Sequence, residues 1–322
     1  KNTFITLEDS EGNIGIGSCA TKNDSEESAR ECFDKLNSFS SSLTGKELAA
    51  DKNTFNWIAS ELPLNSEAIA AVDIALHDLW AKSQKKTLVD ALGKKHQSFN
   101  TSITIGVSSL EKTIEMAKKH IGNGFSILKI KIGDCVEEDI ERMKALFELK
   151  PEKIKIRVDA NRGYSKEQLI KFYDETLDLG LELIEQPMEV DQNSEMLYFP
   201  EEIRKICVAD ESLQNFDHAV RLVQEPKPFG VFNIKLMKCG GIFTARKIAA
   251  LAHENDIKLM WGCFDESKLS ISAALHTALS CENTQYIDLD GFFDLGWDLV
   301  EGGYTCENGI MSVIEKPGLG AY

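Results

Sequence analysis

Short runs of apolar, mostly β-branched residues alternate with amphipathic helical stretches along most of the chain. From residue 101 onward the apolar runs recur at 102–106, 127–132, 154–159, 181–185, 206–210, 231–236, 257–261 and 285–290. Amphipathic helical patterns lie between them, for example at 137–149, 166–179 and 244–255. Strands that alternate with helices favour a parallel sheet. The pattern therefore predicts an α/β fold built from repeated βα units.

The first hundred residues follow a different pattern. Residues 4–7 and 14–17 flank a run of turn residues and predict a β-hairpin. The clearest helix spans 67–82, is apolar on most faces and follows a polar pair, Asn65 and Ser66, that is suited to capping. A helix of this kind is expected to be buried inside a small α+β module.

Ionisable residues stand where six of the predicted strands end: Lys131, Asp159, Glu185, Asp210, Lys235 and Asp288. The first five follow one another at intervals of 28, 26, 25 and 25 residues, and the last interval of 53 is about two such steps. One βα unit per step predicts an eight-stranded barrel of the TIM type, in which the carboxyl ends of all strands meet at one face. These side chains are therefore expected to share one rim.

Asp159, Glu185 and Asp210 end three consecutive predicted strands. Three carboxylates that lie close together repel one another unless a cation neutralises them, and an all-oxygen ligand set suits Mg²⁺. Each acid alone would also fit as the N-cap of the following helix. All three acids stand at the same position, the end of a strand, and lysines stand at the equivalent position on other strands. This shared position favours a metal site.

Lys129 and Lys131 alternate with apolar residues, so both side chains project from one face of their strand. A solvent-facing strand would alternate in the same way, but helices cover the outside of a barrel, so the lysines are expected to point inward. Two neighbouring ammonium groups lower each other's pKa, which suits one of them to act as a general base. Lys235 lies four strands further round, on the opposite wall. Facing lysines suit the removal of a proton from one face of a carbon and its return on the other, while a metal stabilises the enolate.

A set of motifs in fixed order now carries a family resemblance. The motifs are KIK at 129–131, VDAN at 158–161, IEQP at 184–187, ADES at 209–212, NIKLMKCGG at 233–241 and DLDG at 288–291. Together and in this order they resemble the motifs of the muconate-lactonizing-enzyme subgroup of the enolase superfamily. A lysine base that works with Mg²⁺ is known chemistry of this superfamily. The resemblance implies that Asp159, Glu185 and Asp210 bind one Mg²⁺. It also implies that Lys131 and Lys235 are the acid/base catalysts, and that Lys129 tunes Lys131.

The resemblance also implies a domain organisation. The fold is a modified TIM barrel, (β/α)7β, with an α+β capping domain. We expect residues 1–97 to form the cap without its first strands, residues 98–305 to form the barrel with the active site, and residues 306–322 to return to the cap. Because the chain starts with Lys1 and is short for a full cap and barrel, a segment that carries the specificity loop is expected to precede it.

Asp288 and Asp290 discriminate among the reactions of the subgroup. An Asp-Gly pair after a strand often marks a turn, but two aspartates on one face also suit a substrate ammonium group. The pair resembles the DxD motif of dipeptide epimerases, which holds the free α-amino group. We therefore predict a dipeptide epimerase that inverts the α-carbon of the C-terminal residue, converting L-Ala-D-Glu to L-Ala-L-Glu in murein peptide metabolism.

Alternative substrates and functions remain open. Asp265 stands after the seventh strand where an apolar residue is expected, so it favours a polar or cationic dipeptide or else caps the helix that begins near Lys268. Lys129, Asp265, Asp288 and Asp290 are the predicted substrate-binding residues. N-acylamino acid racemase, o-succinylbenzoate synthase and muconate cycloisomerase activities are the alternatives within the subgroup. A Schiff-base aldolase would not need three acids at equivalent strand ends. A catalytically silent barrel would not need to keep the three predicted metal ligands together with both catalytic lysines, and all five residues are present.

Composition limits the classes of partner that the protein can bind and indicates its cellular compartment. The 322 residues include 36 Lys and Arg against 52 Asp and Glu, a net charge of −16, which disfavours nucleic acids and anionic membranes. No apolar run is long enough for a membrane-spanning helix. Eight cysteines without paired spacing indicate reduced thiols, and six histidines show no metal-ligand spacing. We predict a cytoplasmic homo-oligomeric enzyme whose partner is a small dipeptide.

Overall fold

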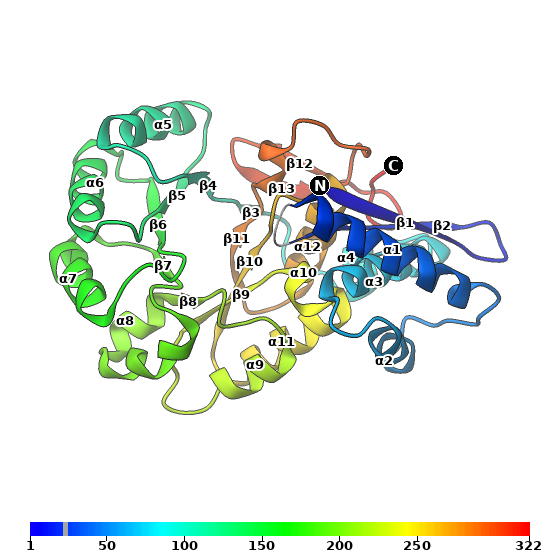
Figure 1. The fold of residues 1–322 in the computed structure, drawn as a ribbon. Helices are drawn as coiled ribbons and strands as arrows, with labels where there is room; N and C mark the ends of the chain where they lie inside the picture. The colour runs from blue at the N-terminus through cyan, green and yellow to red at the C-terminus, as the bar shows by residue number, and fades with distance from the viewer. Residues whose placement is uncertain (22–24) are drawn as a thin grey trace.

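The barrel is the larger part of the molecule (Figure 1). The computed structural model describes residues 1–21 and 25–322, and within them an eight-stranded parallel sheet runs in the order β4 to β11. The strands are β4 (Ile103–Ile105), β5 (Ile127–Lys131), β6 (Lys155–Asp159), β7 (Leu183–Glu185), β8 (Cys207–Ala209), β9 (Val231–Ile234), β10 (Lys258–Gly262) and β11 (Thr284–Asp288). A bridge between Thr101 and Ile287 brings the first and last strands together. The predicted barrel is confirmed, and each observed strand end lies within two residues of its predicted position.

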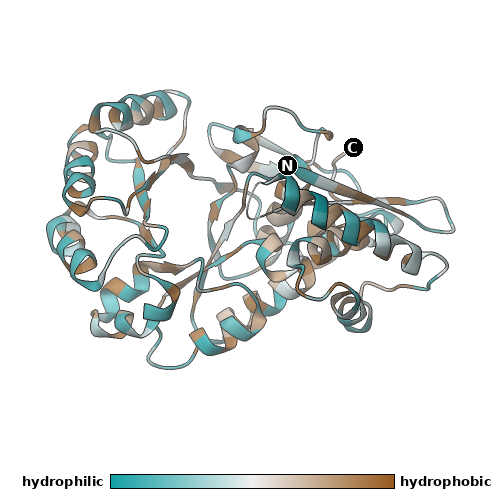
Figure 2. Cartoon of the chain, in the orientation of Figure 1, coloured by the Kyte–Doolittle hydropathy of each residue, from teal (hydrophilic) through white to brown (hydrophobic). Residues whose placement is uncertain are grey.

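Helices surround the strands and shield their apolar side chains. Figure 2 shows hydrophobic strands inside and helices whose outer faces are hydrophilic. The elements between and after the strands are α5 (Leu110–Gly122), α6 (Val136–Leu149), α7 (Lys166–Thr176), η1 (Leu177–Leu179), η2 (Val190–Tyr198), α8 (Glu201–Ile206), α9 (Phe216–Leu222), α10 (Leu236–Cys239), α11 (Ile242–Glu254), α12 (Lys268–Ser280) and η3 (Gly291–Asp294). The helix predicted at 166–179 ends early, since its last turn is the 3-10 helix η1, which stops at Gly180 in the left-handed conformation.

The N-terminal part of the chain packs on one side of the barrel. It contains the antiparallel hairpin of β1 (Asn2–Glu8) and β2 (Ile14–Ala20), and the helices α1 (Glu26–Leu43), α2 (Lys52–Glu61), α3 (Ser66–Ser83) and α4 (Leu88–Leu92). The predicted hairpin and buried helix are confirmed, and Asn65 caps α3 by accepting a hydrogen bond from Ala68 N at 2.7 Å. Gly17 allows β2 to touch α3, because a Cβ there would lie 1.9 Å from Ala71 O.

The C-terminal residues contact this N-terminal part again. A small antiparallel sheet joins β12 (Tyr304–Glu307) and β13 (Ile310–Val313) to β3 (Phe99–Asn100). Beyond it, Gly318 O accepts a hydrogen bond from Leu88 N at 2.7 Å, and Leu319 N donates to Asp78 Oδ1 at 2.8 Å. Among the described helices, none is both long and apolar enough to cross a bilayer.

Asp73 joins helix α3 to the barrel helix α11. Its buried carboxylate accepts hydrogen bonds from Ile242 N at 2.6 Å and Phe243 N at 3.2 Å, in the first turn of a helix whose N-cap, Gly241, has no side chain. We expect Asp73→Ala to lower the free energy of unfolding by about 2–4 kcal/mol, because two buried N–H groups lose their acceptor. Urea denaturation measures this loss. Asp34→Ala, which removes an exposed carboxylate, is the control and should lower the free energy of unfolding by less than about 0.5 kcal/mol. Equal losses in the two variants would contradict the capping role of Asp73.

Candidate active site

A cavity of about 410 Å³ opens at the carboxyl ends of the barrel strands. Its lining comes from both parts of the molecule: Lys1, Ala20, Thr21, Thr104, Lys129, Lys131, Asn161, Asp210, Glu211, Gln214, Lys235, Lys238, Cys263, Phe264, Asp265, Asp288, Asp290, Gly291 and Asp294. Every predicted site residue is in this lining except Asp159 and Glu185, which are buried and contact the lining through Lys129. The structure therefore brings the predicted residues together at one place.

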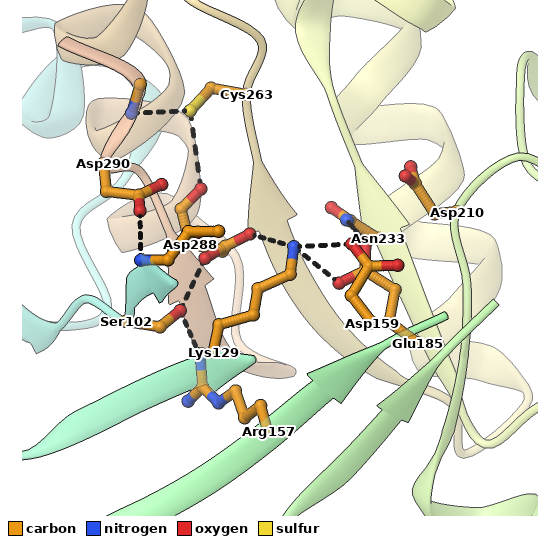
Figure 3. A network of polar contacts seen from close by, with 12 residues as sticks. Ser102, Lys129, Arg157, Asp159, Glu185, Asp210, Asn233, Cys263, Asp288 and Asp290 are labelled. Carbon is orange, nitrogen blue, oxygen red and sulfur yellow. Dashed lines mark hydrogen bonds and ion pairs between the residues drawn. The ribbon is translucent and has the colours of Figure 1, made fainter. Parts of the chain in front are cut away.

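Lys129 lies at the centre of the charged network (Figure 3). Its buried Nζ is 2.6 Å from Asp288 Oδ2, 2.8 Å from Glu185 Oε2 and 3.1 Å from Asp159 Oδ2. Burial disfavours the ammonium form, but the attraction of these carboxylates outweighs burial and raises the pKa of Lys129 well above its usual value. The expectation that two lysines lower each other's pKa is therefore wrong for Lys129, because three acids surround it.

Lys131 and Lys235 stand on opposite walls of the barrel. Lys131 ends β5 and Lys235 directly follows β9, and these two strands are four positions apart in the closed strand order. Lys131 Nζ is 2.7 Å from both Asp159 Oδ2 and Asn161 Oδ1, and Lys235 Nζ is 2.9 Å from Asp210 Oδ2. Both side chains line the cavity. A substrate carbon between them would present one face to each lysine.

The three predicted metal ligands are adjacent along the rim. Asp159 and Glu185 end β6 and β7, and Asp210 directly follows β8. In the described residues no three His, Cys, Asp or Glu side chains are grouped closely enough to hold a metal ion as they stand. The ammonium groups of Lys129 and Lys235 lie against these carboxylates.

The donor set nevertheless fits a hard divalent cation. All three groups are buried carboxylates, and burial together with repulsion from Asp159 raises the pKa of Glu185 to about 7. Close by, Asn233 Nδ2 donates to Glu185 Oε1 at 2.7 Å, while Asn233 Oδ1 and Glu211 Oε2 are buried without a hydrogen-bond partner. Carboxylate and amide oxygens of this kind are ligands that suit Mg²⁺.

Asp288 and Asp290 lie on the other side of Lys129 from Asp159 and Glu185 (Figure 3). Asp288 Oδ1 accepts a hydrogen bond from Ser102 Oγ at 2.6 Å, and Ser102 Oγ is 3.3 Å from Arg157 Nη1. Against the effect of burial, Lys129 lowers the pKa of Asp288. Asp290 Oδ2 accepts from Thr104 N at 2.7 Å, and burial with the charge of Asp288 raises the pKa of Asp290 to about 6.

Comparison with known proteins identifies the family. Residues 1–93 match the model of the mandelate racemase / muconate lactonizing enzyme N-terminal domain, and residues 112–322 match the enolase C-terminal domain-like model. The chain belongs to the mandelate racemase / muconate lactonizing enzyme family of the enolase superfamily. The superfamily that the motifs indicated is confirmed.

Several members of this family resemble the chain over nearly its whole length. An L-Lys-D/L-Arg epimerase of Desulforapulum autotrophicum is 44% identical over 99% of the chain and 91% of the relative. The dipeptide epimerase of Methylococcus capsulatus, crystallised with Mg and L-Arg-D-Lys, has a TM-score of 0.95 at 39% identity and covers 99% of the chain and 91% of that protein. The L-Ala-D/L-Glu epimerase of Bacillus subtilis has a TM-score of 0.91 at 31% identity, with coverage of 99% and 90%.

Two polar residues that support the site in this chain were not identified from its sequence. Lys238 Nζ donates to Asp210 Oδ1 at 2.5 Å and to Asp210 O at 2.7 Å, and Ser102 Oγ holds Asp288. Lys238 follows Lys235 by three residues in the motif at 233–241, a spacing that places two residues on one side of a helical turn. Ser102 carries no such signal, because its partner is 186 residues away.

Asp265 lies in the loop between β10 and α12 and lines the cavity. The alternative that it caps α12 is wrong. Ser267 is the N-cap and accepts a hydrogen bond from Leu269 N at 3.2 Å, while Asp298 Oδ2 accepts from Lys268 N at 2.7 Å. Asp265 is therefore part of the cavity lining and not the cap of α12.

Proposed function

We propose that this chain is a dipeptide epimerase that inverts the α-carbon of the C-terminal residue by proton transfer between Lys131 and Lys235. The observation that carries the proposal is the position of these two lysines on opposite walls of one cavity. The isomerase class predicted from the sequence is confirmed by relatives that are named epimerases.

The two lysines would act in turn on the same carbon. One lysine, in its neutral form, takes the α-proton from one face, and the ammonium of the other donates a proton to the opposite face. The configuration inverts because the proton that leaves and the proton that arrives are on different faces. Running the reaction backwards exchanges the roles of Lys131 and Lys235.

Asp159, Glu185 and Asp210 would hold Mg²⁺. The bound ion would stabilise the negative charge that develops on the substrate carboxylate when the α-proton leaves. Relatives crystallised with Mg confirm the predicted cofactor. Lys129, which contacts two of the proposed ligands and Asp288, would hold these carboxylates in place and tune the nearby Lys131.

Asp288 and Asp290 would bind the free α-amino group of the dipeptide. Both residues line the cavity at the end of β11, and Lys129 separates Asp288 from the proposed metal ligands Asp159 and Glu185. A dipeptide that extends between these two sites presents its carboxylate to one and its ammonium to the other. Asp288 already pairs with Lys129, so a substrate without an ammonium group would chiefly leave the buried Asp290 carboxylate without a counter-charge, which is costly.

We propose a dipeptide with cationic side chains as the substrate, in place of L-Ala-D-Glu. Relatives at 44% and 40% identity are L-Lys-D/L-Arg epimerases, whereas L-Ala-D/L-Glu epimerases match at 33% and 34%. Asp265 and Asp294 are exposed acids in the cavity lining. Carboxylates at these positions attract lysine or arginine side chains and repel glutamate.

A dipeptide library tests the reaction and the substrate together. The enzyme is incubated with Mg²⁺ in D₂O, and mass spectrometry reports which dipeptides gain deuterium at the α-carbon. Exchange in dipeptides that contain lysine or arginine is expected to dominate. Dominant exchange in L-Ala-D-Glu would overturn the cationic assignment, and exchange in acylated amino acids alone would overturn the dipeptide assignment.

Asp265→Asn is expected to reduce kcat/KM for cationic dipeptides about 5-fold and to leave alanine dipeptides nearly unchanged. The substitution removes one charge while it keeps the shape of the side chain, and an exposed charge pair contributes about 1 kcal/mol. Steady-state kinetics on L-Arg-D-Lys and on an alanine dipeptide give the ratio. Asp256→Asn makes the same charge change before β10, at the far end of the barrel, and should alter neither value. A similar loss for both substrates would contradict the role of Asp265.

A further inference from the structure

Two cysteines outside the catalytic site lie in direct contact. Cys19 belongs to β2 and Cys32 to α1, and their sulfur atoms are 3.1 Å apart. Each residue is only 1% exposed. All eight cysteines lie in the described part of the chain and are free thiols, and within that part no other two of them are in sulfur–sulfur contact. This pair therefore differs from the single buried thiols at Cys207 and Cys239.

The contact shifts the pKa values of the two thiols in opposite directions. The hydrogen bond from Cys19 is the main influence that lowers the pKa of Cys32; burial opposes the effect and Lys35 assists it. The same contact and burial raise the pKa of Cys19. Cys32 is thus the sulfur that more readily becomes a thiolate, which is the form that attacks oxidants. A disulfide bond is about 2.05 Å long, so bond formation needs a movement of only about 1 Å.

The pair is next to the wall of the cavity. Ser18, one residue before Cys19, contacts Ser270 of the barrel helix α12 through their hydroxyl oxygens at 2.6 Å. Ala20 and Thr21, directly after Cys19, line the cavity. Cys32 is buried on α1, whereas Phe33, the next residue of the same helix, is 51% exposed.

We propose that Cys19 and Cys32 are a redox modification site at which a peroxide converts the two thiols to a disulfide. The Cys32 sulfur attacks one peroxide oxygen, the O–O bond breaks, and a sulfenic acid and one water result. The Cys19 sulfur then attacks the Cys32 sulfur, the S–O bond breaks, and a second water leaves. The two thiols lose two electrons and two protons in total, and the peroxide takes up both. The product ties α1 to the end of β2 beside the substrate cavity.

Peptide mapping of the full chain tests the proposal. The enzyme is treated with a small excess of hydrogen peroxide, remaining thiols are alkylated after unfolding without reductant, and the digest is analysed by mass spectrometry. We expect a Cys19–Cys32 linked peptide, lighter than its two thiol components by two hydrogens, with the other cysteines alkylated. Recovery of both cysteines in alkylated form, or linkage of either one to another cysteine, would overturn the proposal.

Matched variants separate the two roles. Cys19→Ser is expected to stop the reaction at the Cys32 sulfenic acid, which a dimedone probe captures, whereas Cys32→Ser should give neither the linked peptide nor dimedone labelling at Cys19. Labelling at Cys19 in the Cys32→Ser variant would contradict the assigned order. The oxidised wild-type enzyme is expected to melt roughly 5 °C above the reduced enzyme, because a short loop is closed. A lower melting temperature would show that the disulfide does not fit the native geometry.

Discussion

Replacement of Lys131 or Lys235 by alanine is expected to reduce kcat/KM for epimerisation by about 10³-fold or more. Each lysine serves one face of the α-carbon, so a complete inversion needs both. Loss of one removes either the group that takes the proton or the group that returns it. Circular dichroism or chiral chromatography of the product measures the rate. Lys144→Ala is the control, because Lys144 pairs with Glu175 on the outside of the barrel.

Deuterium exchange distinguishes a loss of one proton-transfer group from a loss of the whole site. In D₂O each variant should still exchange the α-proton of the epimer whose proton faces the remaining lysine, without inversion. The two variants should therefore exchange opposite epimers. Full epimerase activity in either variant, or exchange of the same epimer by both variants, would contradict the two-lysine mechanism.

The barrel could be predicted from the sequence because its pattern is local and repeated. Strands buried on both faces read as short β-branched runs, and the ionisable residue at each strand end recurs at the interval of one βα unit. This phase alone placed Asp159, Glu185 and Asp210 on neighbouring strands and Lys131 opposite Lys235. The structure moves the strand ends by no more than two residues because the apolar runs leave little freedom.

Contacts between distant strands could not be predicted in the same way. The pKa of Lys129 is set by Asp159, Glu185 and Asp288, which come from three other strands, and the sequence shows only the neighbouring Lys131. The cap of α12 was ambiguous for a different reason. Both Asp265 and Ser267 precede the helix, and the backbone path, which no local pattern fixes, decides between them.

Substrate preference was the least predictable property. The motifs of the subgroup describe the shared proton chemistry, while the side chains that meet the substrate lie in the loops after the strands. Asp265 was noticed because it is an acid where an apolar residue was expected. Asp294 lies in η3 and lines the same cavity, but nothing in its local sequence marks it.

The second large effect is expected for Asp288→Asn, which should raise KM for a free dipeptide by about 30-fold or more. The variant removes the charge that would pair with the substrate ammonium, in a buried site where such pairs are strong. The effect on kcat should be smaller, because Lys129 keeps its contacts with Glu185 and Asp159. The N-acetylated dipeptide has no ammonium group, so its KM should change little. Equal changes for the two substrates would remove the ammonium-binding role.

Ser102 offers a graded version of the same experiment, because it touches Asp288 and does not line the cavity. Ser102→Ala deletes the 2.6 Å hydrogen bond to Asp288 Oδ1 but leaves the carboxylate charge in place. A lost hydrogen bond to a charged group corresponds to about 10-fold in KM for the free dipeptide, again with little change for the acetylated one. Ser102→Thr restores a hydroxyl and should recover most of the wild-type KM. If alanine and threonine behave alike, the hydroxyl does not position Asp288, and the contact of Lys129 Nζ with Asp288 Oδ2 at 2.6 Å holds the carboxylate without it.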